Sequence, residues 1–255
     1  MTEPAIVSAV HFVVGCTAVA TGFGALALRK GATPHRATGA VFLIAMTLLT
    51  ASGLWMSLSR GILFTVFLSG IAFHAFFTGW GAAALGRPIG RLVTRASPYV
   101  SGAIAIGALV GGAIAAHAPG GVLNDLPPAA FFVVAIVAVI ICVSDIIFAN
   151  AASPSEQRRV TRHAWRLGFS LFLATGIFFF GNNHVLPAEL RTPPLLSAPV
   201  VAVVVWTFYH SLRARFAREV TFGDIGPEQV VSAKRAAGSV PSNFRFGRRF
   251  QKQTR

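Results

Sequence analysis

The sequence predicts an all-α protein, a polytopic membrane helix bundle of seven transmembrane helices with its N-terminus outside and its C-terminus in the cytoplasm. Three observations predict this fold class. Of the 255 residues, 54% are hydrophobic and only 12% are charged, which is about half the charged share of soluble domains. The apolar residues gather in seven long stretches, and most basic residues follow alternate stretches. This composition excludes a soluble globular domain, and the two cysteines exclude a disulfide scaffold.

The seven apolar stretches each have close to the 17–25 residues, roughly, that a helix needs to cross about 30 Å of hydrocarbon. Backbone polar groups find no water inside a bilayer, so stretches of this length must be helical. The expected helices cover residues 5–28, 39–58, 62–85, 98–118, 128–150, 163–181 and 195–212. Residues 1–212 therefore form a transmembrane domain, and residues 213–255 form a basic tail.

Hydroxyl–proline pairs mark three helix starts, because Ser or Thr caps the first free N–H groups and proline fits the first helical position. The pairs are Thr33-Pro34, Ser97-Pro98 and Ser153-Pro154. The third pair also begins a capping box that ends at Glu156. We therefore expect the sixth helix to start near Pro154 and to run along the interface before it enters the bilayer.

Lysine and arginine set the expected orientation. Twenty of the 22 lie in the loops after helices one, three and five, at the starts of the helices that follow, or after helix seven, whereas Arg60 and Arg191 lie in the other loops. Cytoplasmic loops carry the excess of basic residues, so the positive-inside rule places the N-terminus outside. The formal net charge of +14 is then a topology signal, and nucleic acid is not an expected partner. No basic region precedes the first apolar stretch, so we expect no cleaved signal peptide.

The tail, residues 213–255, contains ten basic residues. Near its end Phe244, Phe246 and Phe250 interleave with Arg245, Arg248 and Arg249. A basic and aromatic segment beside a bilayer can lie on anionic lipid headgroups, whereas a solvated, disordered tail fits the composition equally well. The expected partners are the lipid bilayer and, at the tail, anionic lipids, and the oligomeric state stays open.

An internal repeat relates the ends of helices one and three. Residues 21–28 read TGFGALAL, residues 78–85 read TGWGAAAL, and six of the eight positions are identical. The repeat indicates a duplicated two-helix unit, with chance similarity of Ala- and Gly-rich helices as the alternative. A duplication would give the two helices related positions, with Gly24 and Gly81 at close helix contacts. In helix four, Gly107 and Gly111 form a GxxxG pattern of the same packing type.

Histidines at matching depths suggest b-type haem. Such a haem takes two neutral imidazoles from different helices across an apolar slot. At the inner face, His35 and His163 each lie where a helix enters the bilayer. Arg36 and Arg166 are then expected to pair with the haem propionates.

The outer face offers a second pair of haem ligands, His11 and His117. Two haem sites stacked across the membrane would conduct electrons. The alternative is that interfacial histidines only cap helix ends or reach toward water. No metal other than haem iron is expected, because the chain has no C-x-x-C pair.

Two ionisable residues lie inside apolar stretches. His74 is twelve residues into the third helix, about 18 Å down and near the midplane, and Asp145 is the one acid within an apolar span. Polar groups at such depth are costly and are commonly functional, so this pair suggests a proton relay or a solute-binding group. The alternative is a histidine bonded to a neighbouring Thr or carbonyl, and an aspartate close enough to the interface to be wet.

Two motifs carry a resemblance to a known family. They are Lys30-Gly31…His35-Arg36…Gly39 and Arg162-His163-x-Trp165-Arg166. They resemble the Lys-Gly…His-Arg…Gly loop and the later His-Arg-x-Trp-Met-x-Arg motif of a family of bacterial predicted multi-pass membrane proteins of unknown function. The resemblance covers most of the seven-helix region and implies the bacterial inner (cytoplasmic) membrane. The layout is also similar to b561-like haem bundles, which implies haem b as the cofactor to test.

Three classes of function stay open. The first is a haem-binding or redox membrane protein, the second is a small-solute or proton-linked transporter, and the third is a non-catalytic membrane scaffold. No apolar stretch is broken in the way that discontinuous transporter helices are, and the repeat offset aligns His74 with Thr17 and so duplicates no haem ligand. The sequence carries no dinucleotide-binding, P-loop, zinc-protease or serine-hydrolase motif, and therefore assigns no enzymatic activity.

Overall fold

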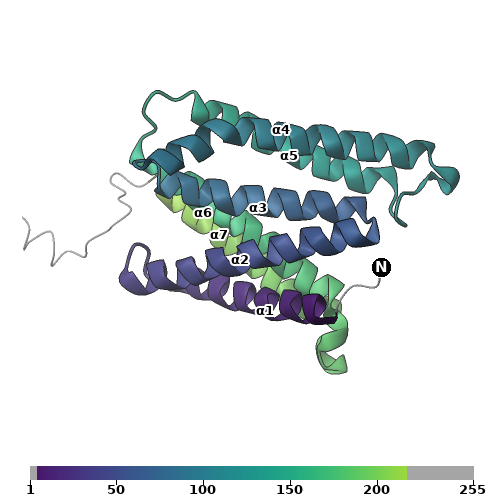
Figure 1. Cartoon of the computed structure of the whole chain (residues 1–255). Helices are drawn as coiled ribbons and strands as arrows, with labels where there is room; N and C mark the ends of the chain where they lie inside the picture. Colours follow the sequence, from purple (N-terminus) through teal and green to yellow (C-terminus); the bar gives the residue numbers. More distant parts are fainter. Residues whose placement is uncertain (1–4, 217–255) are drawn as a thin grey trace, which may run out of the picture.

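The computed structural model describes residues 5–216 and shows a bundle of seven long helices (Figure 1). They are α1 (Ala5–Ala27), α2 (Thr33–Arg60), α3 (Leu63–Ala83), α4 (Pro88–His117), α5 (Pro128–Ala149), α6 (Glu156–Gly176) and α7 (Pro193–Phe216). Four short helical turns lie in two of the connections. The turn η1 (Pro119–Gly121) lies between α4 and α5, and the π-helical turn η2 (Ile177–Gly181), η3 (Asn183–Val185) and η4 (Ala188–Leu190) lie between α6 and α7. The aromatic and basic end of the expected tail lies outside the described residues, and the first residues of that tail extend α7 to Phe216.

All seven long helices are long and apolar enough to cross a membrane. Their outward faces carry large exposed apolar side chains, for example Val133, Ile136 and Ile140 on α5 and Val205 and Phe208 on α7. Such continuous apolar surface is far more than a soluble monomer exposes. The structure therefore confirms the expected all-helical class with seven long apolar helices.

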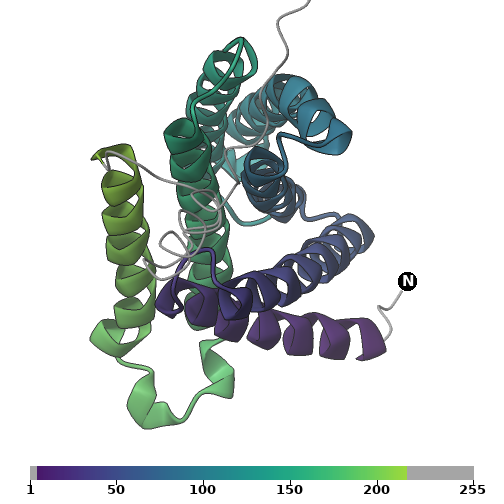
Figure 2. The same cartoon turned by 90° about the vertical axis from the view of Figure 1, so that its left-hand side faces the viewer.

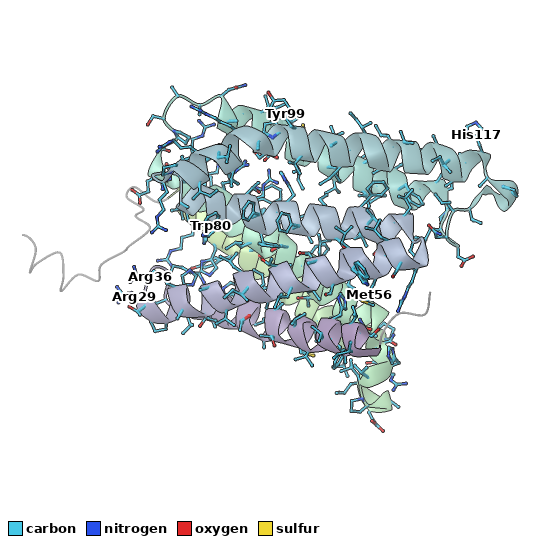
Figure 3. The ribbon with its side chains drawn as sticks, in the orientation of Figure 1. Arg29, Arg36, Met56, Trp80, Tyr99 and His117 are labelled. Atoms are coloured by element: carbon cyan, nitrogen blue, oxygen red, sulfur yellow. The ribbon has the colours of Figure 1, made fainter. Side chains whose placement is uncertain are left out.

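The helices pack mainly with their neighbours in the chain, and α3 and α6 occupy the centre. α4 pairs with α5 on one side of the bundle, α1 pairs with α2 on the other, and α6 packs against both α3 and α7 (Figures 1 and 2). One end of the bundle carries Arg29 and Arg36 and the opposite end carries His117 (Figure 3). We call these the Arg36 end and the His117 end.

Two helices begin earlier than the sequence indicates, at Thr33 and at Pro88. Thr33 is the first residue of α2 and makes no capping bond, since Ala32 occupies the N-cap position. Pro98 lies inside α4 rather than at its start. A proline has no N–H for the carbonyl of residue 94, and the Ser97 hydroxyl donates to that carbonyl over 2.9 Å. The expected start of the fourth helix at residue 98 is therefore wrong, because a serine replaces the bond that proline removes.

The sixth helix starts two residues after the expected position. Its first residue is Glu156, and its N-cap is Ser155, whose side chain accepts from the Arg158 N–H over 3.3 Å. Ser153 therefore does not cap the helix as expected, although a serine cap and an acidic first turn are both present.

The repeated segments of α1 and α3 make equivalent contacts. Gly22 and Gly79 both face α6, where Leu171 lies against the first glycine and the Arg166 Cβ lies 3.0 Å from a Cβ built on the second. Gly24 faces Thr38 of α2, and Gly81 faces Val93 of α4, at 3.2 and 2.8 Å from the built Cβ atoms. Each glycine of the repeat thus meets α6 or the helix that follows it, as a duplicated unit requires.

The last carbonyls of α1 and α3 also receive equivalent donors. Lys30 Nζ donates to Ala25 O and Leu26 O over 2.9 and 2.6 Å. The equivalent carbonyls of α3, Ala82 O and Ala83 O, receive Arg159 Nε and Nη2, both over 3.0 Å. A basic side chain satisfies the free carbonyls and interacts favourably with the helix dipole at both ends.

The expected GxxxG contact in α4 differs in kind from the repeat contacts. Gly107 and Gly111 receive the ring of Phe67, and Gly111 also receives the ring of Phe131. The two glycines therefore make room for aromatic side chains rather than for a close backbone approach.

An apolar cluster fills the centre of the bundle between α1, α2, α3, α6 and α7. Its largest buried members are Phe42, Met46, Phe76, Leu171 and Val203. We call it the central apolar cluster. It separates the polar groups near the Arg36 end from those near the His117 end.

Candidate functional site

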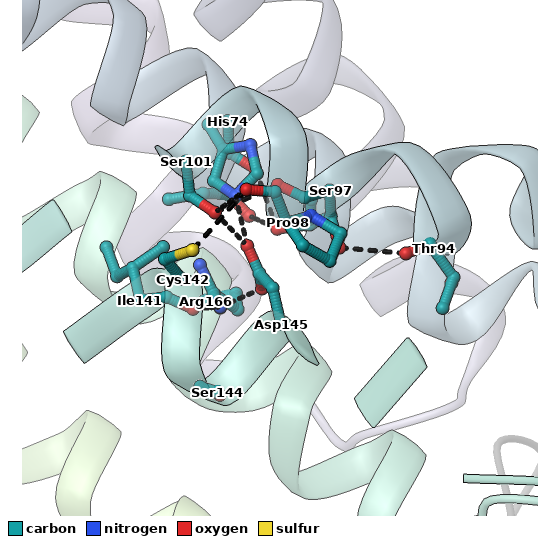
Figure 4. Close-up of polar contacts among 12 residues, drawn as sticks. His74, Thr94, Ser97, Pro98, Ser101, Ile141, Cys142, Ser144, Asp145 and Arg166 are labelled. Atoms are coloured by element: carbon teal, nitrogen blue, oxygen red, sulfur yellow. Dashed lines mark hydrogen bonds and ion pairs between the residues drawn. The ribbon is translucent and has the colours of Figure 1, made fainter. Parts of the chain in front are cut away.

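Asp145 accepts polar contacts from three other helices (Figure 4). The carboxylate is 0% exposed. Its Oδ2 accepts from His74 Nε2 on α3 over 2.7 Å and from the Ser101 hydroxyl on α4 over 2.8 Å. A carboxylate can only accept, so the His74 imidazole carries its proton on Nε2. His74 and Asp145, the two ionisable residues that the sequence places inside apolar stretches, are thus direct partners.

Two arginines of α6 bind the other carboxylate oxygen. Arg162 Nη2 donates to Asp145 Oδ1 over 2.6 Å, and Arg166 Nη2 donates to the same oxygen. The Arg162 guanidinium lies 4.4 Å from the centre of the Phe148 ring, and that of Arg166 lies 4.9 Å from the centre of the Trp165 ring. The two arginines share one face of α6 because they are four residues apart.

This buried cluster holds more positive than negative charge. Two guanidinium groups meet one carboxylate, and Arg162 and Arg166 are 4% and 0% exposed. Arg166 Nε and Nη1 are buried with no hydrogen-bond partner. Buried ion pairs of this kind cost desolvation energy, which offsets much of the attraction between the charges. The cluster acts as a clamp that joins α3, α4, α5 and α6.

The clamp corrects one expectation for the inner haem site. Arg166 was expected to face a haem propionate, but its guanidinium is fully buried against Asp145. Arg36, the other expected partner, is exposed at its end of the bundle (Figure 3). The two arginines therefore do not converge on one group.

The inner histidines lie near each other, and both bond to backbone. His35 Nδ1 lies 3.0 Å from Ala25 O, and His163 Nδ1 lies 3.1 Å from Gly79 O. The two imidazoles and Lys30 are close enough to interact electrostatically. Lys30 lies in the loop between α1 and α2, where burial lowers the pKa of its amine to about 8. These contacts hold the loop and the start of α2 against the end of α1, and they hold α6 against the end of α3.

The space around the inner histidines does not fit a haem. Because Nδ1 of each histidine is bonded to a backbone carbonyl, Nε2 would be the atom that ligates haem iron, as in many metal sites. A haem also needs an open slot, and the central apolar cluster fills the space between α1, α2, α3 and α6. Neither of the two cavities described below is lined by His35 or His163. Haem ligation by this pair stays a prediction that the packing does not favour.

The outer histidines are not brought together. His11 on α1 bonds through Nδ1 to the Ser52 hydroxyl of α2 over 2.9 Å. His117 is exposed and bonds to Ala113 O of its own helix over 2.8 Å. α1 and α4 lie on opposite sides of the bundle (Figures 1 and 2). His11 and His117 are therefore not a ligand pair.

A cavity of about 430 Å³ opens between α1, α2, α3 and the end of α6. Its walls are regular helix faces, since the lining residues of each helix recur every three or four positions. From α2 these are Met46, Leu49, Thr50, Gly53, Met56, Ser57 and Arg60, and from α3 Thr65, Leu68, Ser69 and Ala72. The wall is completed by Ser8, His11, Phe12 and Gly15 of α1, by Ile62 before α3, and by Leu173, Ala174, Ile177, Phe178 and Asn182. Met56 marks its position near the His117 end (Figure 3).

The cavity ends at the middle of the bundle. Its deepest residues, Met46, Ala72 and Ala174, also belong to the central apolar cluster. His74 does not reach it, because residues two apart on a helix point to nearly opposite faces, and Ala72 faces the cavity. The buried clamp and the cavity therefore occupy opposite sides of α3. A second, shallower groove beside Tyr99 is lined by apolar residues of α2, α3 and α4.

Sequence reasoning missed the cavity and two members of the clamp, Arg162 and Ser101. Arg162 stands out in the sequence only within the motif of the family resemblance, although an acid inside an apolar helix commonly pairs with a nearby cation. The i, i+4 pair Arg162 and Arg166 at the same expected depth as Asp145 was the available signal. The cavity had no such signal, because its polar residues come from separate helices and form no motif.

Comparison with family models, curated proteins and solved structures finds no match to this chain.

Proposed function

We propose that this is a multi-pass protein of the bacterial cytoplasmic membrane, with its N-terminus outside, that takes up a small solute through the cavity between α1, α2, α3 and α6. The observation that carries this proposal is the cavity itself. Its volume of about 430 Å³ lies in the range of small-molecule sites, and its mainly apolar wall with a few polar groups is typical of them.

The course of the cavity supports passage rather than binding alone. It enters from the His117 end, which the distribution of basic residues assigns to the outside. It stops at the central apolar cluster, and beyond that cluster lie His35, His163 and Lys30 near the cytoplasmic end. A polar entrance, an apolar barrier and polar groups beyond it are the arrangement expected of a carrier in its outward-open state, which supports the proposal.

The wall of the cavity includes a π-helical turn. α6 ends in the π-helical turn Ile177–Gly181, and Ile177 and Phe178 line the cavity. Phe178 stacks on Phe12 of α1, with ring centres 6.0 Å apart. π-helical turns occur frequently at functional sites, and this one lies next to the entrance.

Uptake by proteoliposomes tests the proposal. The purified protein should speed the entry of at least one member of a panel of radiolabelled neutral, anionic and cationic solutes. Ser69→Phe places a ring in the cavity and should abolish that uptake, whereas Thr47→Phe adds the same ring to the exposed face of α2 and should not. Entry no faster than in protein-free liposomes, or unchanged uptake by Ser69→Phe, would contradict it.

A further inference from the structure

The hydroxyl groups on two walls of the cavity have already used their protons. A hydroxyl has one O–H to donate, and its oxygen can also accept. Thr50 Oγ1 donates to Met46 O over 2.8 Å, and Ser57 Oγ donates to Gly53 O over 2.6 Å. What these two side chains present to a solute is therefore oxygen lone pairs.

A third hydroxyl, on the facing helix, has the same arrangement. Thr65 Oγ1 of α3 donates to Ile62 O over 3.0 Å. Thr50 and Ser57 are buried on α2, so acceptors line the cavity from two of its walls. Ser69 of α3 also lines the cavity and makes no backbone bond of this kind in the described contacts, so its hydroxyl can donate or accept.

We infer that the solute is a neutral molecule that donates hydrogen bonds from a hydroxyl or amide group attached to an apolar body. This inference rests on the proposed function, because it names the class of solute for the same cavity. Three acceptor oxygens favour a solute that donates hydrogen bonds. The Ser69 hydroxyl can in turn donate to the oxygen of the solute's own hydroxyl or amide group. Phe12, Met46, Met56, Leu173 and Phe178 provide the surface for the apolar body.

Arg60 lines the mouth of the cavity and is exposed there, whereas the buried depth beside Thr50 disfavours ionised solutes of both signs. A carboxylate would face the lone pairs of three hydroxyls that have no proton left to donate. An ammonium group would find acceptors but no carboxylate, since no acidic side chain is among the described residues of the wall, and a buried unpaired cation is costly. A neutral donor avoids both penalties.

Titration calorimetry in lipid nanodiscs tests the inference, with empty nanodiscs subtracted. The probes are benzyl alcohol, benzyl methyl ether, benzoate and benzylamine. We expect the alcohol to bind about three- to tenfold more tightly than the ether, the worth of about one hydrogen bond. It should also bind more tightly than the two ions.

A matched pair of variants tests whether the preference for the alcohol over the ether arises in the cavity. Thr50→Val removes one acceptor from the cavity and should bring the alcohol-to-ether ratio toward one. Thr47→Val removes the same type of side chain, with the same bond to a carbonyl four residues earlier, from the exposed face of α2 and should keep the ratio. Ser57→Ala serves as the second cavity variant if Thr50→Val fails to fold.

The outcomes separate the inference from the proposed function. The inference is overturned if the ether binds as tightly as the alcohol, if either ion binds most tightly, or if Thr47→Val lowers the ratio as much as Thr50→Val. Binding of the alcohol without its uptake into proteoliposomes leaves the inference standing and removes transport. No binding of any probe overturns the inference, and the uptake panel then decides the proposed function by itself.

Discussion

Asp145 is the residue on which most of the buried polar contacts depend. It receives both guanidinium groups, the His74 imidazole and the Ser101 hydroxyl, and it is 0% exposed. A buried charge is tolerable only when it is paired and hydrogen-bonded. Removing the one negative member of the clamp would leave Arg162 and Arg166 beside each other with no counter-charge.

Asp145→Asn should therefore lower the free energy of unfolding by about 3–5 kcal/mol, the cost of breaking a buried ion pair from one side. Denaturant unfolding in detergent, followed by circular dichroism, measures the change. Asp125→Asn is the matched control, because Asp125 is exposed and its positive φ of 61° suits asparagine. Equal stability of the two variants would mean that the clamp contributes nothing to the free energy of unfolding.

Replacing the whole clamp tests whether it stabilises or only specifies the packing. In the triple variant Asp145→Leu, Arg162→Met and Arg166→Met, every buried charge of the ion pairs is removed together. We expect it to be more stable than Asp145→Asn, because apolar replacements of buried ion pairs are commonly neutral or stabilising. A triple variant less stable than Asp145→Asn would show that the ion pairs themselves stabilise the fold.

Lys30 should titrate near pH 8, because burial between α1 and α2 disfavours its charged form. The ordinary lysine pKa is about 10.4. Between these values the unfolded chain binds more protons than the folded protein, so stability should increase with pH across this window. Acetylation rates of Lys30 measured by mass spectrometry against pH should have their midpoint near 8 in the folded protein and near 10.4 after denaturation. A midpoint near 10.4 in the folded protein would contradict this assignment.

Helices were predictable as elements, but their starts were not. Seven continuous apolar stretches of this length sufficed to predict seven helices, because such a stretch satisfies its backbone in lipid within itself only as a helix. The start of α4 was placed ten residues late, at Pro98 instead of Pro88. A proline usually marks a helix start, but here the Ser97 hydroxyl takes the place of the missing N–H. That compensation depends on a side-chain rotamer and cannot be read from spacing.

The sequence repeat correctly predicted that the ends of α1 and α3 pack against their neighbours in related ways. The first glycine of each segment lies against α6, and the second lies against the next helix in the chain. Among the contacts of these glycines with β-branched side chains, the one that a Cβ at Gly81 would make is the shortest. A Cβ there would lie 2.8 Å from Val93 Cγ1, and a β-branched valine on a helix has little rotamer freedom with which to move away.

Gly81→Ala should therefore lower stability by about 1–3 kcal/mol through overpacking. Gly39→Ala is the control, because a Cβ at Gly39 of α2 meets nothing within 4 Å. That substitution should instead stabilise by up to about 1 kcal/mol, since alanine loses less backbone entropy in a helix. Thermal unfolding of the two variants gives the signs, and a stabilised Gly81→Ala would remove the physical basis of the repeat.

For the whole molecule, sequence predicted which residues are unusual but not which of them meet. His74 and Asp145 stood out because polar groups are rare in apolar stretches, and they are bonded in the structure. His11 and His117 also matched in depth, yet they lie on opposite sides of the bundle. Depth follows from position along a helix, whereas partnership depends on how the helices turn toward each other, and one sequence does not contain that rotation.

The orientation of the whole bundle is the last expectation open to direct test. Arg162 and Arg166 belong to the buried clamp and so contribute less to the topology signal than loop residues do. Even without them, the basic residues on the side of the Arg36 end greatly outnumber Arg60 and Arg191 on the other, so the positive-inside rule keeps its sign. A reporter that is active only in the cytoplasm, fused after Arg255, should be active, and the same reporter inserted beside Asn124 should be silent. A reporter that is active only outside should give the reverse pattern. Cytoplasmic activity beside Asn124 would invert the bundle and turn the cavity inward, which would make it an exit for the solute rather than its entrance.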